Sequence, residues 1–162
     1  MSLEVPTKLE SEINRLVRNY PEKRSASLMV LHALQEEFGY ISRDAEEWAA
    51  ARLGLQPINI HELVTFYPML REHDPGRTVV RVCRTLSCAL AGSHKLHRHI
   101  CDTLGLDANG HGLQRTTDGK FGVEYAECLA SCGTGPVMMC SDDFYENVTN
   151  DGADEILEKY DE

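Results

Sequence analysis

The stretch TVVRVCRTLSC, residues 78–88, contains the clearest structural signal in this chain. Its first five residues are rich in β-branched side chains and follow a turn signal at residues 74–76, which together predict a short strand. That strand runs directly into Cys83. The pattern returns in FGVEYAECLASC, residues 121–132, where a predicted strand leads to Cys128 and Cys132. We therefore expect two cysteine pairs, in loops that follow two strands, at one end of a single sheet.

The remainder of the second half completes a small α/β unit. A predicted helix over 90–104 ends before Gly105, and a loop containing glycine and asparagine follows over 105–119. After the second cysteine pair we expect strands over 137–140 and 144–148, a turn between them at 142–143, and a final helix over about 152–160.

The N-terminal half contains no cysteine and little β signal, and it predicts helices. Apolar side chains at spacings of three and four mark one face of a helix over 27–40. Asp44 and Glu47 have the spacing of a capping box for the next helix, which should end at Gly54. Two more helices are expected, one over 9–20 that stops before Pro21, and one that begins near Pro57 and places Ile60, Leu63, Val64 and Tyr67 on one face.

The change of pattern near residues 74–76 predicts an α+β chain with an N-terminal helical bundle over residues 1–75 and an α/β domain over 76–162, and the length has room for two small domains. The apolar fraction is 42% and the charged fraction 26%, which is typical of soluble globular proteins. No apolar run approaches the ~20 residues that cross a bilayer, and the N-terminus lacks the pattern of a secretory signal. We therefore expect a cytoplasmic location without direct membrane insertion.

The charge balance restricts the class of partner. Lys and Arg number 16 against 26 Asp and Glu, so the formal net charge is −10, which argues against nucleic acid as a partner. Residues 141–162 hold nine acidic side chains and a single lysine. This segment is either a solvated face or a surface that docks a basic partner.

Spacing within the two cysteine pairs limits the kind of centre that they could hold. Four residues separate Cys83 from Cys88, and three separate Cys128 from Cys132. Structural zinc sites usually use two-residue spacers, since tight turns aim both sulfurs at one small ion. The plant-type ferredoxin spacing and the Rieske histidines are both missing from the sequence. A [2Fe–2S] centre is favoured because each iron takes two thiolates, while zinc and redox-active or inert thiols stay open.

At this point the sequence resembles a known family. The segments CRTLSC at 83–88 and CLASC at 128–132, together with ELVTFY at 62–67 and GTGPVM at 133–138, are similar to the thioredoxin-like [2Fe–2S] ferredoxins, and among them to the E-type subunits of NADH:quinone oxidoreductase, respiratory complex I. The resemblance covers nearly the whole chain. It implies a thioredoxin-like fold for 76–162.

The resemblance also implies a site and a function. The four ligands of one [2Fe–2S] cluster would be Cys83, Cys88, Cys128 and Cys132. The chain would be an electron-carrying subunit without catalytic activity of its own, which exchanges single electrons with the FMN of an NADH-oxidising partner subunit. Both would belong to a larger peripheral arm on the cytoplasmic face of the membrane.

Two other settings stay open. Related subunits occur in NAD-linked hydrogenases and formate dehydrogenases, and a free thioredoxin-like ferredoxin or a zinc-binding module is a further alternative. The helical half favours a stable complex, because a free carrier has little need of it. Phe66, Tyr67 and Met69 are candidate docking contacts, although a core role fits them equally well.

Several residues near the cysteines have a possible secondary role. Backbone N–H groups of the ligand loops, Gly133 and Gly135 among them, could donate to the sulfurs, and Arg84 could add positive charge beside a ligand. Pro136 stands where thioredoxin-like folds commonly carry a cis proline, although X–Pro bonds are mostly trans, so its isomer stays open.

The other sulfur and imidazole side chains are expected to be structural. Cys101 and Cys140 fit buried small apolar residues. His94, His97 and His99 lie on one predicted helix, and we interpret them as a surface cluster rather than a metal site.

Overall fold

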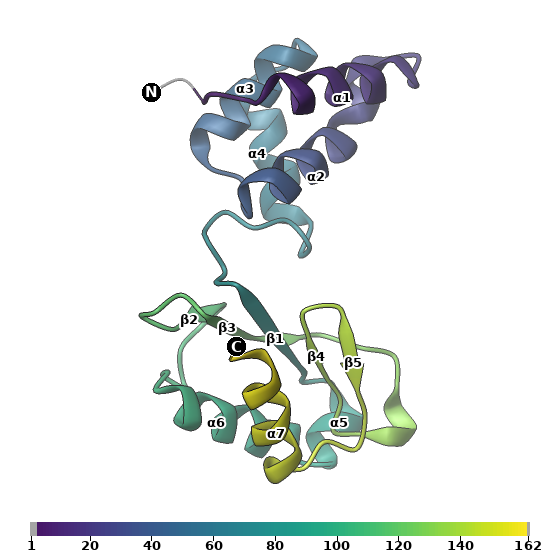
Figure 1. Ribbon diagram of the computed structural model, residues 1–162. Helices are drawn as coiled ribbons and strands as arrows, with labels where there is room; N and C mark the ends of the chain where they lie inside the picture. Colours follow the sequence, from purple (N-terminus) through teal and green to yellow (C-terminus); the bar gives the residue numbers. More distant parts are fainter. Residues whose placement is uncertain (1–2, 162) are drawn as a thin grey trace. The chain divides into compact units, whose positions relative to one another are not determined.

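The computed structural model describes residues 3–161. The chain divides between Asp74 and Pro75 into two compact units, the first helical and the second built on a sheet (Figure 1). The α+β class predicted from the sequence is confirmed.

The first unit consists of helices that pack through one apolar core. They are α1 (Thr7–Arg18), the 3₁₀ turn η1 (Lys23–Ala26), α2 (Ser27–Phe38), α3 (Arg43–Leu53) and α4 (Pro57–Phe66). Ile13 of α1, Leu31 and Leu34 of α2, and Ile60 of α4 are fully buried in this core. Pro57 opens α4 at its first turn, as predicted, because its missing N–H would have no helical partner there.

The start of α3 differs from the prediction. The N-cap is Ser42, whose Oγ accepts a hydrogen bond from the Ala45 amide at 3.2 Å. Asp44 lies inside the first turn, so the predicted Asp44–Glu47 capping box is wrong. The negative charge of Asp44 still interacts favourably with the positive end of the helix dipole. The predicted end of α3 is confirmed at Gly54, which has a φ of +70°.

A buried carboxylate joins α3 to α4. Glu46 Oε1 lies 2.8 Å from His61 Nδ1, and Glu46 Oε2 accepts from Arg43 Nη1 at 3.0 Å. The Glu46 side chain is only 3% exposed. A carboxylate at such a depth needs these partners, because an unpaired buried charge is strongly unfavourable.

The second unit has a mixed five-stranded sheet in the order β2-β3-β1-β4-β5. The strands are β1 (Thr78–Cys83), β2 (Gln114–Arg115), β3 (Phe121–Ala126), β4 (Met138–Cys140) and β5 (Asp143–Tyr145). Central β1 runs parallel to β3 and antiparallel to β4. Helices α6 (Ser93–Leu104) and α7 (Asn150–Tyr160) pack against each other and share the core with Val80, Val82 and Val123 of the sheet (Figure 1).

Three local features of the second unit depart from the prediction. Strand β2 lies inside the expected loop 105–119, and β5 begins at Asp143 and ends before the predicted strand does. The expected helix over 90–104 corresponds to α6, which begins three residues later, and the short helix α5 (Leu86–Leu90) was not predicted. Gly92 separates them with a φ of +106°, a left-handed conformation that ends one helix and that glycine adopts without a steric penalty.

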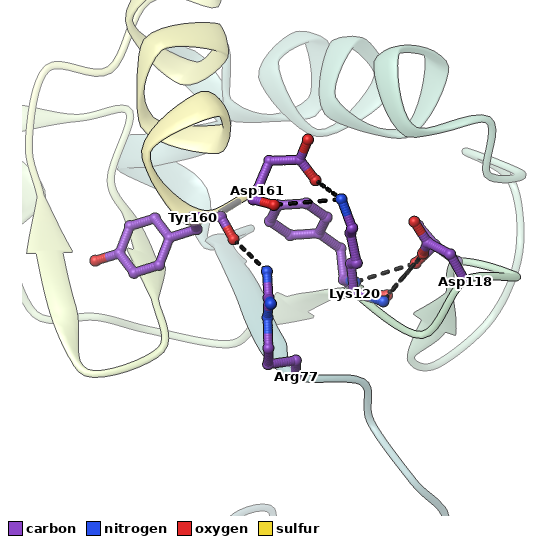
Figure 2. A network of polar contacts seen from close by, with 7 residues as sticks. Arg77, Asp118, Lys120, Tyr160 and Asp161 are labelled. Atoms are coloured by element: carbon purple, nitrogen blue, oxygen red, sulfur yellow. Dashed lines mark hydrogen bonds and ion pairs between the residues drawn. The ribbon is translucent and has the colours of Figure 1, made fainter.

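Two cations hold the C-terminal end of α7 (Figure 2). Arg77 Nη2 donates to the Tyr160 carbonyl at 2.9 Å, and Lys120 Nζ donates to the carbonyl and carboxylate of Asp161 at 3.2 and 2.6 Å. Arg77 lies just before β1 and Lys120 just before β3, so the final helix is fastened to the start of both parallel strands. Positive groups at this position also complement the helix dipole.

Within residues 3–161, no helix combines the length and the apolar composition that a membrane span requires.

Candidate functional site

The two cysteine pairs follow the ends of two neighbouring parallel strands. Cys83 is the last residue of β1, and it stands opposite Ala126, the last residue of β3. The Arg84 amide donates to the Ala126 carbonyl at 2.9 Å, which continues the ladder one step beyond the sheet. Since parallel strands end at the same edge, the two loops leave the sheet side by side, as the sequence predicts.

The first pair is buried. Cys83 and Cys88 are each 2% exposed and pack against Val137, whose carbonyl accepts from the Cys83 amide at 3.1 Å. Cys88 lies in α5, where Leu86 and Leu90 on either side of it are 75% and 81% exposed. The short helix therefore presents one thiol to the interior and two apolar side chains to solvent.

Hydrogen bonding around the first pair favours a thiolate at Cys83. Burial by itself raises the pKa of the Cys83 thiol. Hydrogen bonds oppose this effect, one from the Thr85 hydroxyl, 3.3 Å from Sγ, and others from the backbone of Leu129 and Thr85. Together they outweigh burial and leave the pKa of Cys83 below its ordinary value. Burial raises the pKa of Cys88, and its hydrogen bond with Cys83 adds to this shift. The two thiols of the first pair are therefore hydrogen-bonded to each other.

The second pair is exposed, and a network of hydroxyl groups supports its loop. Cys128 Sγ accepts from the Ala130 amide at 3.4 Å, and Cys132 begins a short 3₁₀ turn, η2 (Cys132–Thr134). Ser131 Oγ and Thr134 Oγ1 both donate to the carboxylate of Glu146. These bonds hold the Glu146 carboxyl pKa below its usual range, so the support is an ionised side chain.

The donor set fits a group with two metal ions. All six cysteines are free thiols, and Cys132 is near enough to Cys88 to affect its pKa by charge. Among residues 3–161, no three His, Cys, Asp or Glu side chains gather as ligands of a single ion. Two pairs of thiols are the kind of donor set that a binuclear iron centre uses, because each iron takes two thiolates. At Gly135 a Cβ would lie 3.2 Å from Ala91 Cβ and 3.4 Å from Cys88 Sγ, so glycine keeps this side of the first pair open.

Other expectations near the cysteines have mixed outcomes. The amide donors found at the sulfurs belong to Ala130, Leu129, Thr85 and Val137, and the described contacts include none from the expected Gly133 and Gly135. The Gly135–Pro136 bond is cis.

Cys101 and Cys140 lie in the core of the second unit, as expected. Both are 0% exposed. Burial raises the pKa of Cys101 to about 11 and that of Cys140 to about 12, so both are inert thiols at neutral pH.

The interpretation of the three histidines as a surface cluster is wrong for His97. That side chain is buried and stacks on Tyr125 with ring centroids 3.8 Å apart, and burial lowers its pKa. It lies on the sheet-facing side of α6 together with Leu96, Ile100 and Cys101. His94 remains at the surface, while partly exposed His99 contacts Asp154 at 2.8 Å.

The apolar end of α4 is exposed. Within the first unit, Phe66 is 76%, Met69 55% and Tyr67 37% exposed, so a core role for them is excluded. The Phe66 and Tyr67 rings meet edge to face with centroids 5.1 Å apart.

Sequence reasoning missed Glu127, Glu146 and Tyr125. Glu127 pairs with Arg84, whose guanidinium lies 5.9 Å from the Tyr125 ring. The position of Glu127 directly before Cys128, mirroring Arg84 directly after Cys83, is a signal that the sequence does contain. For Glu146 we find no signal of this kind.

Comparison with known proteins gives one family. A family model described as thioredoxin-like [2Fe–2S] ferredoxin matches residues 13–161. The NADH-quinone oxidoreductase E subunit 2 of Rhizobium meliloti (strain 1021) is 33% identical over 94% of this chain and 88% of its own length. The NADH-quinone oxidoreductase E subunit of Aquifex aeolicus (strain VF5) is 32% identical over 97% of this chain and 96% of its own.

A solved structure shares the fold. An NAD⁺-reducing [NiFe]-hydrogenase in the air-oxidized state aligns with a TM-score of 0.68 and 20% identity, covering 81% of this chain and 22% of the hydrogenase chain. At this identity the likeness concerns the fold alone.

Proposed function

Since the chain belongs to the thioredoxin-like [2Fe–2S] ferredoxin family, we propose that it is the electron-carrying subunit of an NADH:quinone oxidoreductase. In this role it exchanges single electrons with the FMN of a partner subunit that oxidises NADH, within a larger peripheral arm at the cytoplasmic face of the membrane. The observation that carries the proposal is the placement of two cysteine pairs in adjacent loops at the end of parallel β1 and β3.

We assign the cluster to Cys83, Cys88, Cys128 and Cys132. When bound, a [2Fe–2S] cluster supplies a reversible store for one electron. The chain's own residues bury the first pair against Val137 and leave the second pair exposed. This arrangement keeps water from one side of the site and leaves the other side open toward an electron partner.

Hydrogen bonds to sulfur are the means by which the chain tunes this site. Amides at Thr85 and Leu129 face Cys83, and the amide of Ala130 faces Cys128. Each donor stabilises negative charge on sulfur, and reduction adds negative charge, so these amides raise the reduction potential. The formal net charge of −10 acts in the opposite direction.

The docking surface in this proposal includes the exposed end of α4. Phe66 and Met69 are large apolar side chains that would otherwise stay in water, and aromatic and Met side chains are enriched in protein interfaces. A partner subunit that buries them gains the free energy of removing this apolar surface from water.

A related setting has weaker support. The fold likeness to the NAD⁺-reducing hydrogenase fits an equivalent electron-carrying role in such an enzyme. The identity of co-purifying subunits separates the two settings.

The test compares Cys128→Ser with Cys101→Ser in the full chain. We expect about two irons per chain and visible absorbance in the unmodified protein, loss of both in Cys128→Ser, and an unchanged spectrum in Cys101→Ser. The opposite pattern would overturn the ligand assignment. Purification from the native host should recover a flavin-binding subunit, and NADH oxidation by the isolated chain alone would contradict the proposed division of roles.

A further inference from the structure

Two charged side chains join the loops that carry the cysteines. Arg84 directly follows Cys83, Glu127 directly precedes Cys128, and the two side chains form an ion pair. A backbone hydrogen bond lies beside this pair, since the Arg84 amide donates to the Ala126 carbonyl at 2.9 Å. Residues 43 positions apart in the sequence therefore meet beside both proposed ligand pairs.

The strand register places this pair. In the β1–β3 ladder Arg81 is opposite Glu124, and these side chains approach to 3.7 Å. Three residues further along both strands, the same register puts Arg84 opposite Glu127. The ion pair thus continues the parallel pairing past the end of the sheet, into the loops where no ladder remains to hold them.

Arg84 is also restrained by an aromatic ring. Its guanidinium carbon lies 5.9 Å from the Tyr125 ring centre, within the range of a cation–π contact. The Tyr125 ring is itself stacked on buried His97. Arg84 is therefore held between a fixed ring and Glu127, although its side chain is 49% exposed.

We propose that Arg84 and Glu127 form a neutral latch that holds the two ligand loops together and balances the charge beside the cluster. This inference rests on the proposed function, because it takes the four cysteines as ligands. The latch brings one positive charge next to Cys83 and one negative charge next to Cys128, so their effects on the sulfurs largely cancel.

The two halves of the latch act on reduction with opposite signs. Arg84 stabilises the extra electron and Glu127 destabilises it. Losing Arg84 leaves an unbalanced carboxylate and lowers the midpoint potential, whereas losing Glu127 leaves an unbalanced guanidinium and raises it. Losing both restores neutrality and returns the potential close to its original value.

An ion pair that served only overall folding stability would lower the unfolding midpoint in all three variants, without opposite shifts of the potential. Exposed ion pairs contribute little to folding, so the unfolding midpoint of the chain should hardly change in any of these variants. The latch acts locally, because it holds only the two ligand loops beside the cluster. Cluster loss should therefore be faster in both single variants and in the double variant.

The experiment uses the full chain with its cluster and the variants Arg84→Gln, Glu127→Gln and the double. Lys120→Gln is the matched control, since it breaks a partly exposed ion pair with Asp161 in the same unit, at the end of α7 rather than at the ligand loops (Figure 2). The readouts are the midpoint potential by spectroscopic redox titration, the rate of cluster loss to an iron chelator, and the unfolding midpoint.

We expect opposite shifts of potential in the two single variants, a potential near the original in the double variant, and no shift in Lys120→Gln. Shifts of the same sign, or single variants that behave like Lys120→Gln, would overturn the latch. If the unmodified chain binds no binuclear iron, the proposed function itself fails, and the latch fails with it. A cluster that binds normally but responds as the control does refutes the latch alone.

Discussion

Val137 provides a test of how the core supports the ligand loops. Its side chain is 0% exposed and packs against both Cys83 and Cys88. Val137→Ala removes two methyl groups, which at about 0.8 kcal/mol per buried carbon amounts to about 1.6 kcal/mol of transfer free energy. The cavity that remains raises the expected loss of stability to about 2–3 kcal/mol. Because the cavity adjoins both thiols, we also expect faster cluster loss.

Val80→Ala is the matched control. Val80 is also 0% exposed, but it packs in the core of the second unit among Val82, Val123 and the helices α6 and α7. We expect it to reduce stability by a similar amount and to affect cluster loss less.

Two measurements separate the effects. Hydrogen exchange of the β1 and β3 amides gives the opening free energy of the second unit itself, and absorbance during a chelator challenge gives the rate of cluster loss. A stability change below about 0.5 kcal/mol in Val137→Ala would refute the packing argument. Equal rates of cluster loss in the two variants would refute the link between Val137 and the ligand pair.

Three further predictions concern other groups. Glu46→Ala should destabilise the first unit by about 1–3 kcal/mol, measured by urea unfolding, because His61 loses its buried acceptor. Glu146→Gln should speed cluster loss without changing the protein's unfolding midpoint, since a neutral amide holds the two hydroxyls of the second ligand loop less firmly. Cys101 and Cys140 should resist iodoacetamide at pH 8 until urea is added, as read by mass spectrometry. Burial raises the pKa of Cys101 from 9.0 to about 11 and that of Cys140 from 9.0 to about 12. The stability that these thiols contribute is therefore present below about pH 9 and is lost as the pH rises toward 12. In Cys140→Ala, stability should fall less steeply over this pH range.

Local patterns predicted most of the elements. The helix over 27–40, the strands that precede the cysteine pairs and the helix that begins at Pro57 follow from periodicity, β-branched runs and proline geometry, which act between near neighbours. The incorrect predictions of helix ends also came from such local patterns. A glycine with positive φ at position 92 delays the start of one expected helix to Ser93, and Ser42 rather than Asp44 caps another, because backbone angles choose between equally suitable residues.

Burial was harder to predict than secondary structure. His97 and Phe66 both fit either surface or core by sequence, and each has the environment opposite to its polarity. His97 faces the sheet because of its angular position on α6, where Tyr125 of β3 supplies a stacking partner. Phe66 is the last residue of α4, and its side chain lies outside the apolar core of the first unit.

The order of residues along the chain is enough to define the cysteine spacing, the helical first half and the family resemblance, because all three depend on residues close together in sequence. The order of residues alone does not determine which charged side chains lie beside the sulfurs. The meeting of Arg84 with Glu127, and of Glu146 with Ser131 and Thr134, depends on strand register and on segments folded back over the ligand loops. Such contacts exist only once the sheet has formed, since nothing local brings residues so distant in the sequence within reach of one another.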